Sequence, residues 1–166
     1  GQGCPQGTEL RWQAEGRALV PMRRARESDA GAITSIVHEA YAPYIARIGK
    51  QPAPMLDDYR RVIAQAMVFV VDVEGAARGV LVLEQKGDVL HVQNVAVSDQ
   101  ARGQGVGRQL MNFAEGQARE LGCRAIELYT NELMTENILI YPRLGYRETR
   151  RAVEEGYARV FFRKTV

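Results

Sequence analysis

The sequence predicts one α/β domain with a mixed, mostly antiparallel central sheet of about seven strands flanked by about four helices. The chain has 166 residues, of which 46% are hydrophobic and 25% are charged, which is typical of a single soluble globular domain. Segments with strand and helix patterning alternate along most of the chain. Three successive strand segments are joined by two short turns, and turns of that length favour an antiparallel meander.

The N-terminal segment, residues 1–21, differs from the rest of the chain. It is rich in Gly and Gln and has no hydrophobic periodicity. We expect it to be a disordered or non-native extension with little function, and Met22 is a candidate for the natural start. The domain is therefore predicted to cover residues 22–166, with a short first strand over residues 20–26.

Two helices are predicted before the meander. Ser28 and Asp29 form a plausible helix cap, apolar residues follow at helical spacing, and Pro43 ends that helix. Residues 44–55 contain one Gly and two Pro, which indicates a loop or a broken helix. Residues 57–67 are predicted to form the second helix.

The remaining elements follow in a regular order. The meander strands are predicted over residues 68–74, 78–85 and 89–97. A helix with an apolar stripe follows, formed by Val106, Leu110, Phe113, Ala114 and Leu121 and ended by Gly122. The last predicted elements are a strand over 125–130, a short helix over 137–144, and a hairpin of residues 146–151 and 157–164.

The most informative stretch is the glycine-rich loop that opens the third helix. Gly103, Gly105 and Gly107 alternate there. Without a Cβ atom, glycine allows backbone N–H groups to turn towards a ligand and lets that ligand approach closely. Because free N–H groups and the helix dipole favour an anion at a helix N-terminus, the loop predicts a phosphate or pyrophosphate site. Arg102 and Arg108 add positive charge at its rim.

Two common phosphate-binding loops do not match. A P-loop needs a Lys followed by Ser or Thr after its last glycine, and no Lys lies here. A dinucleotide-binding fold needs Gly-x-Gly-x-x-Gly in an early βαβ unit, whereas this loop reads Gly-x-Gly-x-Gly after a meander.

Three motifs resemble the GNAT N-acetyltransferase superfamily. Asn-Val-Ala-Val (residues 94–97) followed by Arg-x-x-Gly-x-Gly (residues 102–107) resembles its motif A. Residues 137–146, which begin with Asn and end with Gly-Tyr, resemble a shortened form of the Asn–Tyr–Gly block that comes later in the family's sequences. Residues 22–29 resemble the typical first segment of the family. The resemblance covers residues 22 to about 164, and it implies a sheet that splays between the fourth strand, 89–97, and the fifth, 125–130.

The resemblance implies acetyl-CoA as cosubstrate, bound in the gap between those two strands. The pantetheine arm would pair with the main chain of Val95, Ala96 and Val97. The pyrophosphate would lie on the N–H groups of Arg102, Gly103, Gln104, Gly105, Val106, Gly107 and Arg108. Asn137 matches the family's Asn that hydrogen-bonds the pantetheine arm, and Tyr141 matches the Tyr that protonates the leaving thiolate.

The implied reaction is direct transfer of the acetyl group in a ternary complex. A neutral primary amine attacks the thioester carbonyl, and a main-chain N–H near Val95 stabilises the oxyanion. The ammonium form must first lose a proton to a base, often through water. His91 is the candidate base on the fourth strand because its pKa lies near 6.5 when unperturbed, although a half-buried strand histidine without a role fits as well. Gln93 cannot act as a base, and the further candidates are Glu84, Glu127 and Glu132.

Other side chains receive weaker predictions. The residues beside the first long loop could form a substrate wall or simply pack in the core; these are Tyr41, Tyr44, Met55 and Tyr59. Cys123 reads as a buried structural thiol, because the family uses direct transfer. Pro142 is expected to kink or shorten the helix that carries Tyr141.

Composition excludes several classes of function. The net charge of +2 does not predict a nucleic-acid partner. Two Cys and two distant His do not predict a disulfide framework or a metal site. No apolar run reaches the length of a membrane span, and the N-terminus lacks the apolar middle of a signal peptide, so we expect a cytoplasmic protein without a membrane partner.

Three alternatives stay open from the sequence. The acyl group could be longer than acetyl, or the acceptor could be a protein or peptide amine rather than a small molecule. The domain could be a non-catalytic acyl-CoA-binding module, or it could bind another phosphate ligand. A homodimer is plausible because the C-terminal strands of such folds often pair across subunits.

Overall fold

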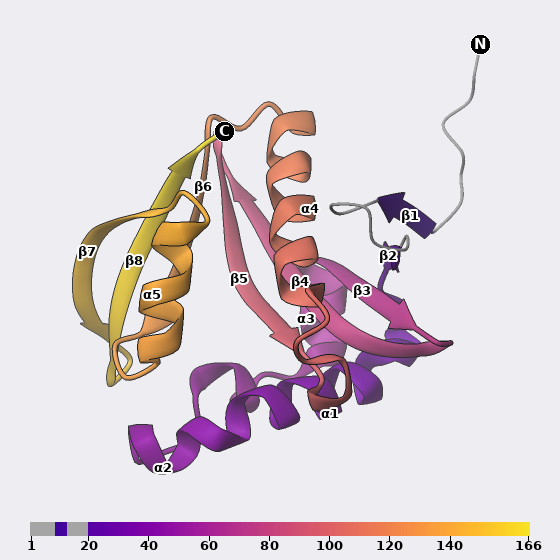
Figure 1. Ribbon diagram of the computed structural model, residues 1–166, viewed down its shortest axis with the longest axis horizontal. Coiled ribbons are helices and arrows are strands. Elements are labelled where there is room, and N and C mark those ends of the chain that lie inside the picture. The colour runs from indigo at the N-terminus through magenta and orange to yellow at the C-terminus, as the bar shows by residue number, and fades with distance from the viewer. Residues whose placement is uncertain (1–8, 13–19) are drawn as a thin grey trace.

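A single twisted sheet organises the chain, and the computed structural model describes it over residues 9–12 and 20–166 (Figure 1). The eight strands lie in the order β1-β2-β3-β4-β5-β6-β8-β7. Every neighbouring pair is antiparallel except β5 and β6, which are parallel. The strands are β1 (Glu9–Trp12), β2 (Val20–Arg24), β3 (Met67–Val73), β4 (Ala76–Lys86), β5 (Val89–Val97), β6 (Ala125–Asn131), β7 (Arg147–Glu154) and β8 (Tyr157–Thr165).

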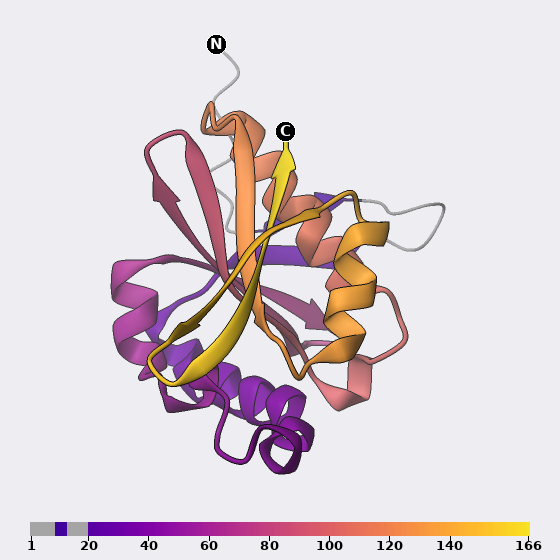
Figure 2. The same ribbon diagram turned by 90° about the vertical axis from the view of Figure 1, so that its left-hand side faces the viewer.

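Helices cover both faces of this sheet (Figures 1 and 2). One core cluster joins the sheet to α4 and α5, and the other joins it to α1 and α3. The helices are α1 (Ala30–Tyr41), the four-residue α2 (Ile45–Ile48), α3 (Tyr59–Gln65), α4 (Val106–Glu120) and α5 (Thr135–Arg143). In the described part of the chain, no helix has the length and apolar character needed to cross a membrane.

The predicted fold class is confirmed. The seven predicted strands correspond to β2–β8, and the four longest helices correspond to the four predicted ones. The fourth and fifth predicted strands, β5 and β6, form the parallel pair. Leu121 was expected in the buried stripe of α4, but it is 38% exposed because the helix ends at Glu120 and the chain turns at Gly122.

One strand was not predicted. β1 lies within residues 1–21 and pairs antiparallel with β2 at one edge of the sheet. Residues 1–8 and 13–19 lie outside the described residues. That the segment 1–21 is a non-native extension with little function therefore stays a prediction.

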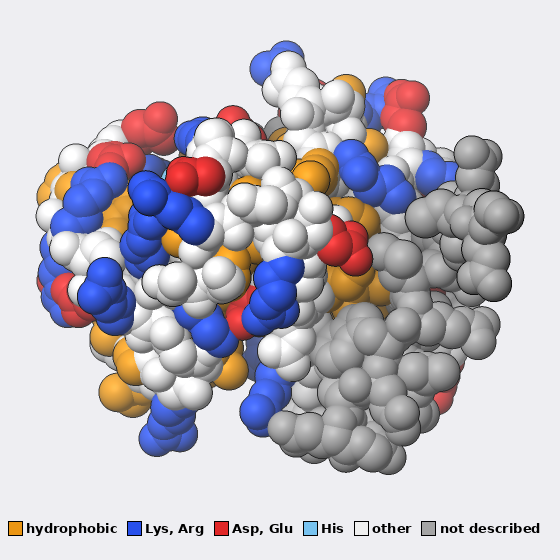
Figure 3. Space-filling view, turned by 90° about the horizontal axis from the view of Figure 1, so that it is seen from above, with side chains coloured by type: hydrophobic (Ala, Val, Ile, Leu, Met, Phe, Trp, Pro, Cys, Tyr) orange, Lys and Arg blue, Asp and Glu red, His pale blue; other side chains and the backbone are white. Residues whose placement is uncertain are grey.

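The other edge of the sheet is β7, and its side chains are mostly exposed. Arg151 pairs there with Glu148 at 2.6 Å and with Glu132 at 3.2 Å. Arg and Lys side chains stand beside Asp and Glu side chains on this side of the molecule when it is viewed from above (Figure 3). Charges on an open edge hinder unspecific pairing with other sheets. The possible homodimer stays a prediction.

Gly79 of β4 sets how closely α4 packs on the sheet. A Cβ atom at this position would lie 3.0 Å from Val106 Cγ1 and 3.2 Å from Leu110 Cδ1, and both of these side chains are buried. The close contact between helix and sheet therefore requires a residue without a side chain here.

We expect Gly79→Ala to lower the free energy of unfolding by about 1–3 kcal/mol, because α4 must shift away from the sheet. Gly116→Ala is the matched control. Gly116 lies on α4, and nothing lies within 4 Å of the position that its Cβ atom would take. The control should raise stability by about 0.5–1 kcal/mol. Urea denaturation measures both, and equal effects of the two substitutions would contradict this account of the packing.

Candidate active site

The sheet opens between its two parallel strands. β5 and β6 pair from Val89 opposite Ala125 to Val92 opposite Leu128, and no further pairing between them is found in the described residues. On the β4 side the register shifts at the same place, so that Gln93 forms a bulge. The backbone groups of residues 93–97 that face β6 therefore lack a strand partner there. Buried backbone groups require a hydrogen-bonding partner, so the gap suits an extended ligand.

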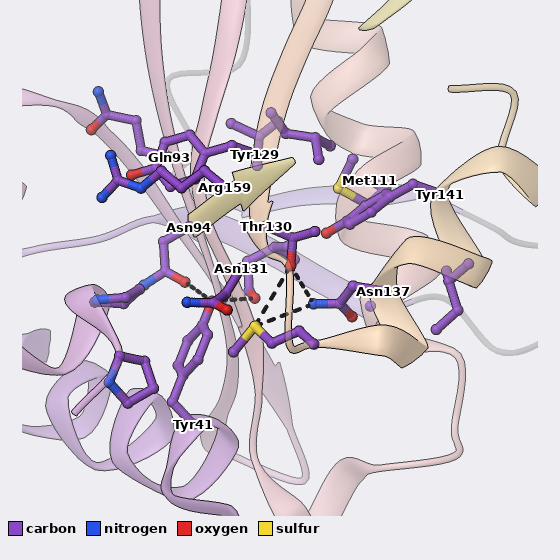
Figure 4. A pocket seen from close by; sticks show the side chains of 18 of the residues that line it. Tyr41, Gln93, Asn94, Met111, Tyr129, Thr130, Asn131, Asn137, Tyr141 and Arg159 are labelled. Carbon is purple, nitrogen blue, oxygen red and sulfur yellow. Dashed lines mark hydrogen bonds between the residues drawn. The ribbon is translucent and has the colours of Figure 1, made fainter. Parts of the chain in front are cut away.

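The first cavity, of about 390 Å³, lies in this gap, and α4 and α5 border it on one side and Tyr41 of α1 on the other (Figure 4). Both splayed strands, the first turns of α4, the inner side of α5 and the segment before α3 contribute to its wall. Its lining includes Val95, Val97, Gly107, Arg108, Met111, Thr130, Asn137, Tyr141, Pro52, Tyr157 and Arg159.

The glycine-rich loop leads from β5 into α4 at one end of this cavity. Gly103 and Gly105 have φ angles of 80° and 79°, in the left-handed region that side chains disfavour, and Gly105 is the N-cap of α4. The first N–H groups of a helix have no partner within the helix. The predicted anion site thus lies at the N-terminus of a fifteen-residue helix, and Gly107 and Arg108 of its first turn line the cavity.

Asn137 and Tyr141 both project from α5 into the cavity (Figure 4). The Asn137 amide donates to Thr130 Oγ1 at 3.1 Å. Tyr141 is 8% exposed, and burial raises the pKa of its hydroxyl to about 12. This hydroxyl is therefore protonated at neutral pH and can donate a proton. Pro142 is the penultimate residue of α5, so the helix ends one residue after it, in line with the expected shortening.

A partly buried ion pair anchors the end of α5. Lys164 Nζ lies 2.6 Å from Glu115 Oε1 of α4 and donates to the Leu144 carbonyl at 2.8 Å. Tyr146 packs edge-on against Tyr141, with ring centroids 5.8 Å apart. The position of the Tyr141 ring thus depends on contacts from α4 and β8. No sequence motif signals this cluster, because its members are far apart in the chain.

A second buried network fixes the strand beyond the bulge (Figure 4). The Tyr41 hydroxyl donates to Asn94 Oδ1 at 2.8 Å, and the Asn94 amide donates to the Tyr59 hydroxyl at 3.1 Å. The Tyr59 hydroxyl in turn donates to the Pro54 carbonyl at 2.6 Å. Burial raises the pKa of both tyrosines well above the ordinary value, so both stay neutral. The network ties α1, α3 and the segment before α3 to β5.

His91 lies on the opposite face of the sheet from α4, in a second cavity of about 470 Å³. Its Nδ1 is 3.9 Å from Glu127 Oε2, and Glu127 also accepts a hydrogen bond from Arg163. Partial burial lowers the pKa of His91, although the charge of Glu127 opposes this. His91 is therefore mostly neutral at neutral pH and can accept a proton.

The two cavities adjoin each other through the splay, because seven residues line both. These are Ala53, Pro54, Val92, Gln93, Leu128, Tyr129 and Arg159. Arg159 is the charged member of this shared wall. It is 8% exposed, lies over the Tyr129 ring at 4.2 Å and pairs with Glu154 at 3.2 Å. Tyr141 and His91, the two predicted catalytic residues, thus face different cavities on either side of the shared wall.

The other predicted cofactor residues divide into two groups. Val95, Val97, Gly107, Arg108 and Asn137 line the first cavity. The rest do not: Ala96 packs in the core towards α1, Val106 packs in the core beneath α4, and Arg102, Gly103, Gln104 and Gly105 form the loop outside the lining. The role predicted for this second group is a main-chain role, which does not require a side chain in the cavity.

The weaker candidates also separate. Tyr41 lines the first cavity, Met55 and Tyr59 are buried in the core, and Tyr44 hydrogen-bonds Glu136. Glu84 hydrogen-bonds Gln93 beside the second cavity, whereas Glu132 pairs with Arg151 on the surface. Cys123 is buried, as predicted. The sequence did not indicate Thr130, Tyr129 or Arg159, which reach the cavities from strands whose patterning shows only alternation.

No three His, Cys, Asp or Glu side chains come together as metal ligands among the residues that the structure describes. The polar side chains at the first cavity carry hydroxyl, amide and guanidinium groups, and those at the second cavity also include imidazole, carboxylate and ammonium groups. The arrangement can bind an anion at one end, donate a proton from Tyr141 on one side of the sheet and accept a proton at His91 on the other.

The chain is similar to known acetyltransferases. Residues 64–148 match the family model described as an acetyltransferase (GNAT) domain. The "uncharacterized N-acetyltransferase YjgM" of Escherichia coli (strain K12) is 30% identical over 134 residues, which is 75% of this chain and 80% of that protein.

Solved structures show the same fold at lower identity. The PaiA N-acetyltransferase of Thermoplasma acidophilum, solved in complex with coenzyme A, is 12% identical, with a TM-score of 0.71 over 89% of this chain and 99% of that chain. The ribosomal-protein-S18-alanine N-acetyltransferase of Escherichia coli is 16% identical, with a TM-score of 0.68 over 87% of this chain and 92% of that chain.

The hydrogen-bond network at Asn94 generates a stability prediction. Asn94→Ala should lower the free energy of unfolding by about 1–3 kcal/mol, because the Tyr41 hydroxyl loses its main acceptor and the Tyr59 hydroxyl loses a donor. Tyr44→Phe is the control, since it removes only a hydrogen bond at the surface, and it should change stability by less than about 0.5 kcal/mol. Chemical denaturation measures both variants, and a cost at Asn94 no larger than the control would show that the network does not hold the strand.

Proposed function

The chain belongs to the GNAT acetyltransferase family, and on that premise we propose that it transfers the acetyl group of acetyl-CoA to a primary amine by direct attack in a ternary complex. The observation that carries this proposal is the glycine-rich N-terminus of α4, which opens onto the cavity between the splayed strands. The N-terminus of α4 supplies an anion site, and the splayed strands supply unpaired backbone groups beside it. A thioester cosubstrate with a pyrophosphate and an amide-bearing arm matches both.

The first cavity is proposed to hold acetyl-CoA. The N–H groups of residues 102–108 would hold the pyrophosphate, and the main chain of residues 95–97 would pair with the pantetheine arm. The Asn137 amide group, which Thr130 orients, would bind the same arm. The structure solved for the PaiA enzyme with coenzyme A supports this assignment for the fold. The thioester supplies the activated acyl group.

The second cavity is proposed to hold the acceptor amine. The amine would attack the thioester carbonyl carbon through the splay at Gln93, where the two cavities share a wall. A main-chain N–H near Val95 would stabilise the oxyanion as it forms. His91, acting through water, would take the proton that the attacking nitrogen loses.

Collapse of the oxyanion breaks the carbon–sulfur bond. Tyr141 is proposed to give its hydroxyl proton to the departing thiolate and to regain a proton from solvent. The raised pKa of Tyr141 means that its hydroxyl is fully protonated at neutral pH and so carries the proton that this role requires. The products are the acetylated amine and free CoA.

The first test combines binding with turnover. Calorimetric titration with acetyl-CoA should show micromolar binding, and a CoA-release assay over a panel of amines should show transfer. Tyr141→Phe should lower kcat by about 10²–10⁴-fold while acetyl-CoA affinity stays within a few fold, because only the proton donor is lost. Binding without turnover of any amine would favour a non-catalytic acyl-CoA-binding module, and absence of binding by any acyl-CoA would overturn the proposal.

The fall of kcat/KM at acid pH tests whether His91 is the base. Its pKa is lowered by burial, so the basic form persists at neutral pH, and kcat/KM should fall only as the pH drops below about 6.5. Glu127→Gln should move this fall to still lower pH, because it removes the nearby negative charge that supports the protonated form. His91→Gln should abolish this acid limb; if the limb persists in that variant, the base is another group, with Glu84 and Glu127 the nearest candidates.

A further inference from the structure

The segment between α2 and α3, residues 50–56, contributes to the walls of both cavities, and we refer to it as the strap. It contains two prolines, which restrict its backbone, and it ends in the 3₁₀ turn Ala53–Leu56. Ala53 and Pro54 of the strap belong to the wall that both cavities share. The strap therefore bounds the space that an acceptor must enter.

Direct contacts fasten the strap to the β7–β8 hairpin. Lys50 Nζ donates to the Gly156 carbonyl at 2.9 Å and lies 4.0 Å from the centre of the Tyr157 ring. The Tyr157 hydroxyl donates to the Gln51 carbonyl at 2.6 Å. The connection between α2 and α3 accordingly lies beside the end of the hairpin (Figure 2). We call these contacts of Lys50 and Tyr157 the latch.

The opposite side of the strap is also fixed. The Pro54 carbonyl accepts the hydrogen bond from the Tyr59 hydroxyl, which belongs to the network that includes Asn94. Hydrogen bonds from the side chains of Lys50, Tyr157 and Tyr59 thus hold the strap between β5 and the hairpin. Opening it requires breaking the latch or the network.

The latch occupies the space between the strap and the hairpin. An extended chain lying there would need about 4.8 Å to a strand on each side, and the side chains of Lys50 and Tyr157 bridge that space with hydrogen bonds to Gly156 and Gln51. A peptide could therefore pass between them only if the latch broke. A molecule that enters the second cavity as a whole meets no such obstacle.

The second cavity has the size and the lining of a small-molecule site. Its volume of about 470 Å³ lies in the range of pockets for small ligands. Its wall carries charged groups of both signs, among them Asp57, Glu155, Lys86 and Arg150. These groups complement a polar or charged acceptor, so a polar one is favoured.

We propose that the acceptor is a small polar amine, and that the latch excludes protein and peptide amines from the site. This inference rests on the proposed acetyl transfer and specifies its substrate class. The latch residues Lys50 and Tyr157 are specificity determinants, since they close the space between the strap and the hairpin and make no proton transfer themselves.

The test is an acetylation panel read by mass spectrometry with acetyl-CoA as donor. The small amines are putrescine, L-lysine and glucosamine; the large ones are a hexapeptide with a free N-terminus and an internal Lys, and an unfolded protein. The full chain is compared with Lys50→Met/Tyr157→Phe, which removes the latch, and with Arg60→Met. Arg60 is the matched control because its surface ion pair with Glu27 lies outside both cavities.

We expect the full chain to use at least one small amine about tenfold or more better, in kcat/KM, than either polypeptide. The latch variant should reduce this preference about tenfold, mainly through KM, because two hydrogen bonds are lost. Arg60→Met should keep the wild-type preference. Thermal melts and acetyl-CoA affinity establish that each variant is folded, and a merely structural latch would change both acceptor classes equally.

Two results would overturn this proposal. One is acetylation of a polypeptide by the full chain as efficiently as any small amine, and the other is an unchanged preference in a folded latch variant. Either result leaves the proposed acetyl transfer standing. Transfer to neither class while acetyl-CoA binds would overturn the acetyl transfer itself and the acceptor class with it.

Discussion

The incomplete pairing of β5 with β6 is the constraint on which the rest of the structure depends. Hydrogen bonds join these strands only as far as Val92 and Leu128, and the bulge at Gln93 directs the following residues away from β6. Buried backbone groups that lose a strand partner are costly unless another partner replaces it. The fold thus carries an intrinsic requirement for an extended ligand, and the proposed cosubstrate meets that requirement with its amide-bearing arm.

An opening in a sheet persists only if the surrounding elements hold the strands apart. Here the support comes from long-range side-chain contacts on both faces. On one face Tyr41 and Tyr59 hold Asn94, and on the other Lys164 links Glu115 of α4 to the end of α5. Both groups of contacts lie behind the cavities, so they can keep the site open without occupying it.

The sequence predicted the elements well, because strand alternation, helical spacing, prolines and glycines act locally. It also predicted that Asn137 and Tyr141 lie in one site. It did not predict that His91 belongs to a second cavity, and β1 carried no signal. The bulge explains part of this limit: His91 and Asn94 are an odd number of residues apart, yet they lie on the same face of the sheet, because Gln93 interrupts the alternation. Contacts such as Lys164 with Glu115 join residues that no local pattern relates.

The division of the site into two adjoining cavities has a consequence for how such a protein can evolve. A substitution in the shared wall, at Tyr129 or Arg159 for example, alters the surroundings of both proposed substrates at once. Lys86 and Thr149 line the second cavity alone. Preference for the proposed acceptor can therefore change through residues of this second kind while recognition of the proposed acyl donor is conserved, so that one scaffold can take new acceptors without losing its donor.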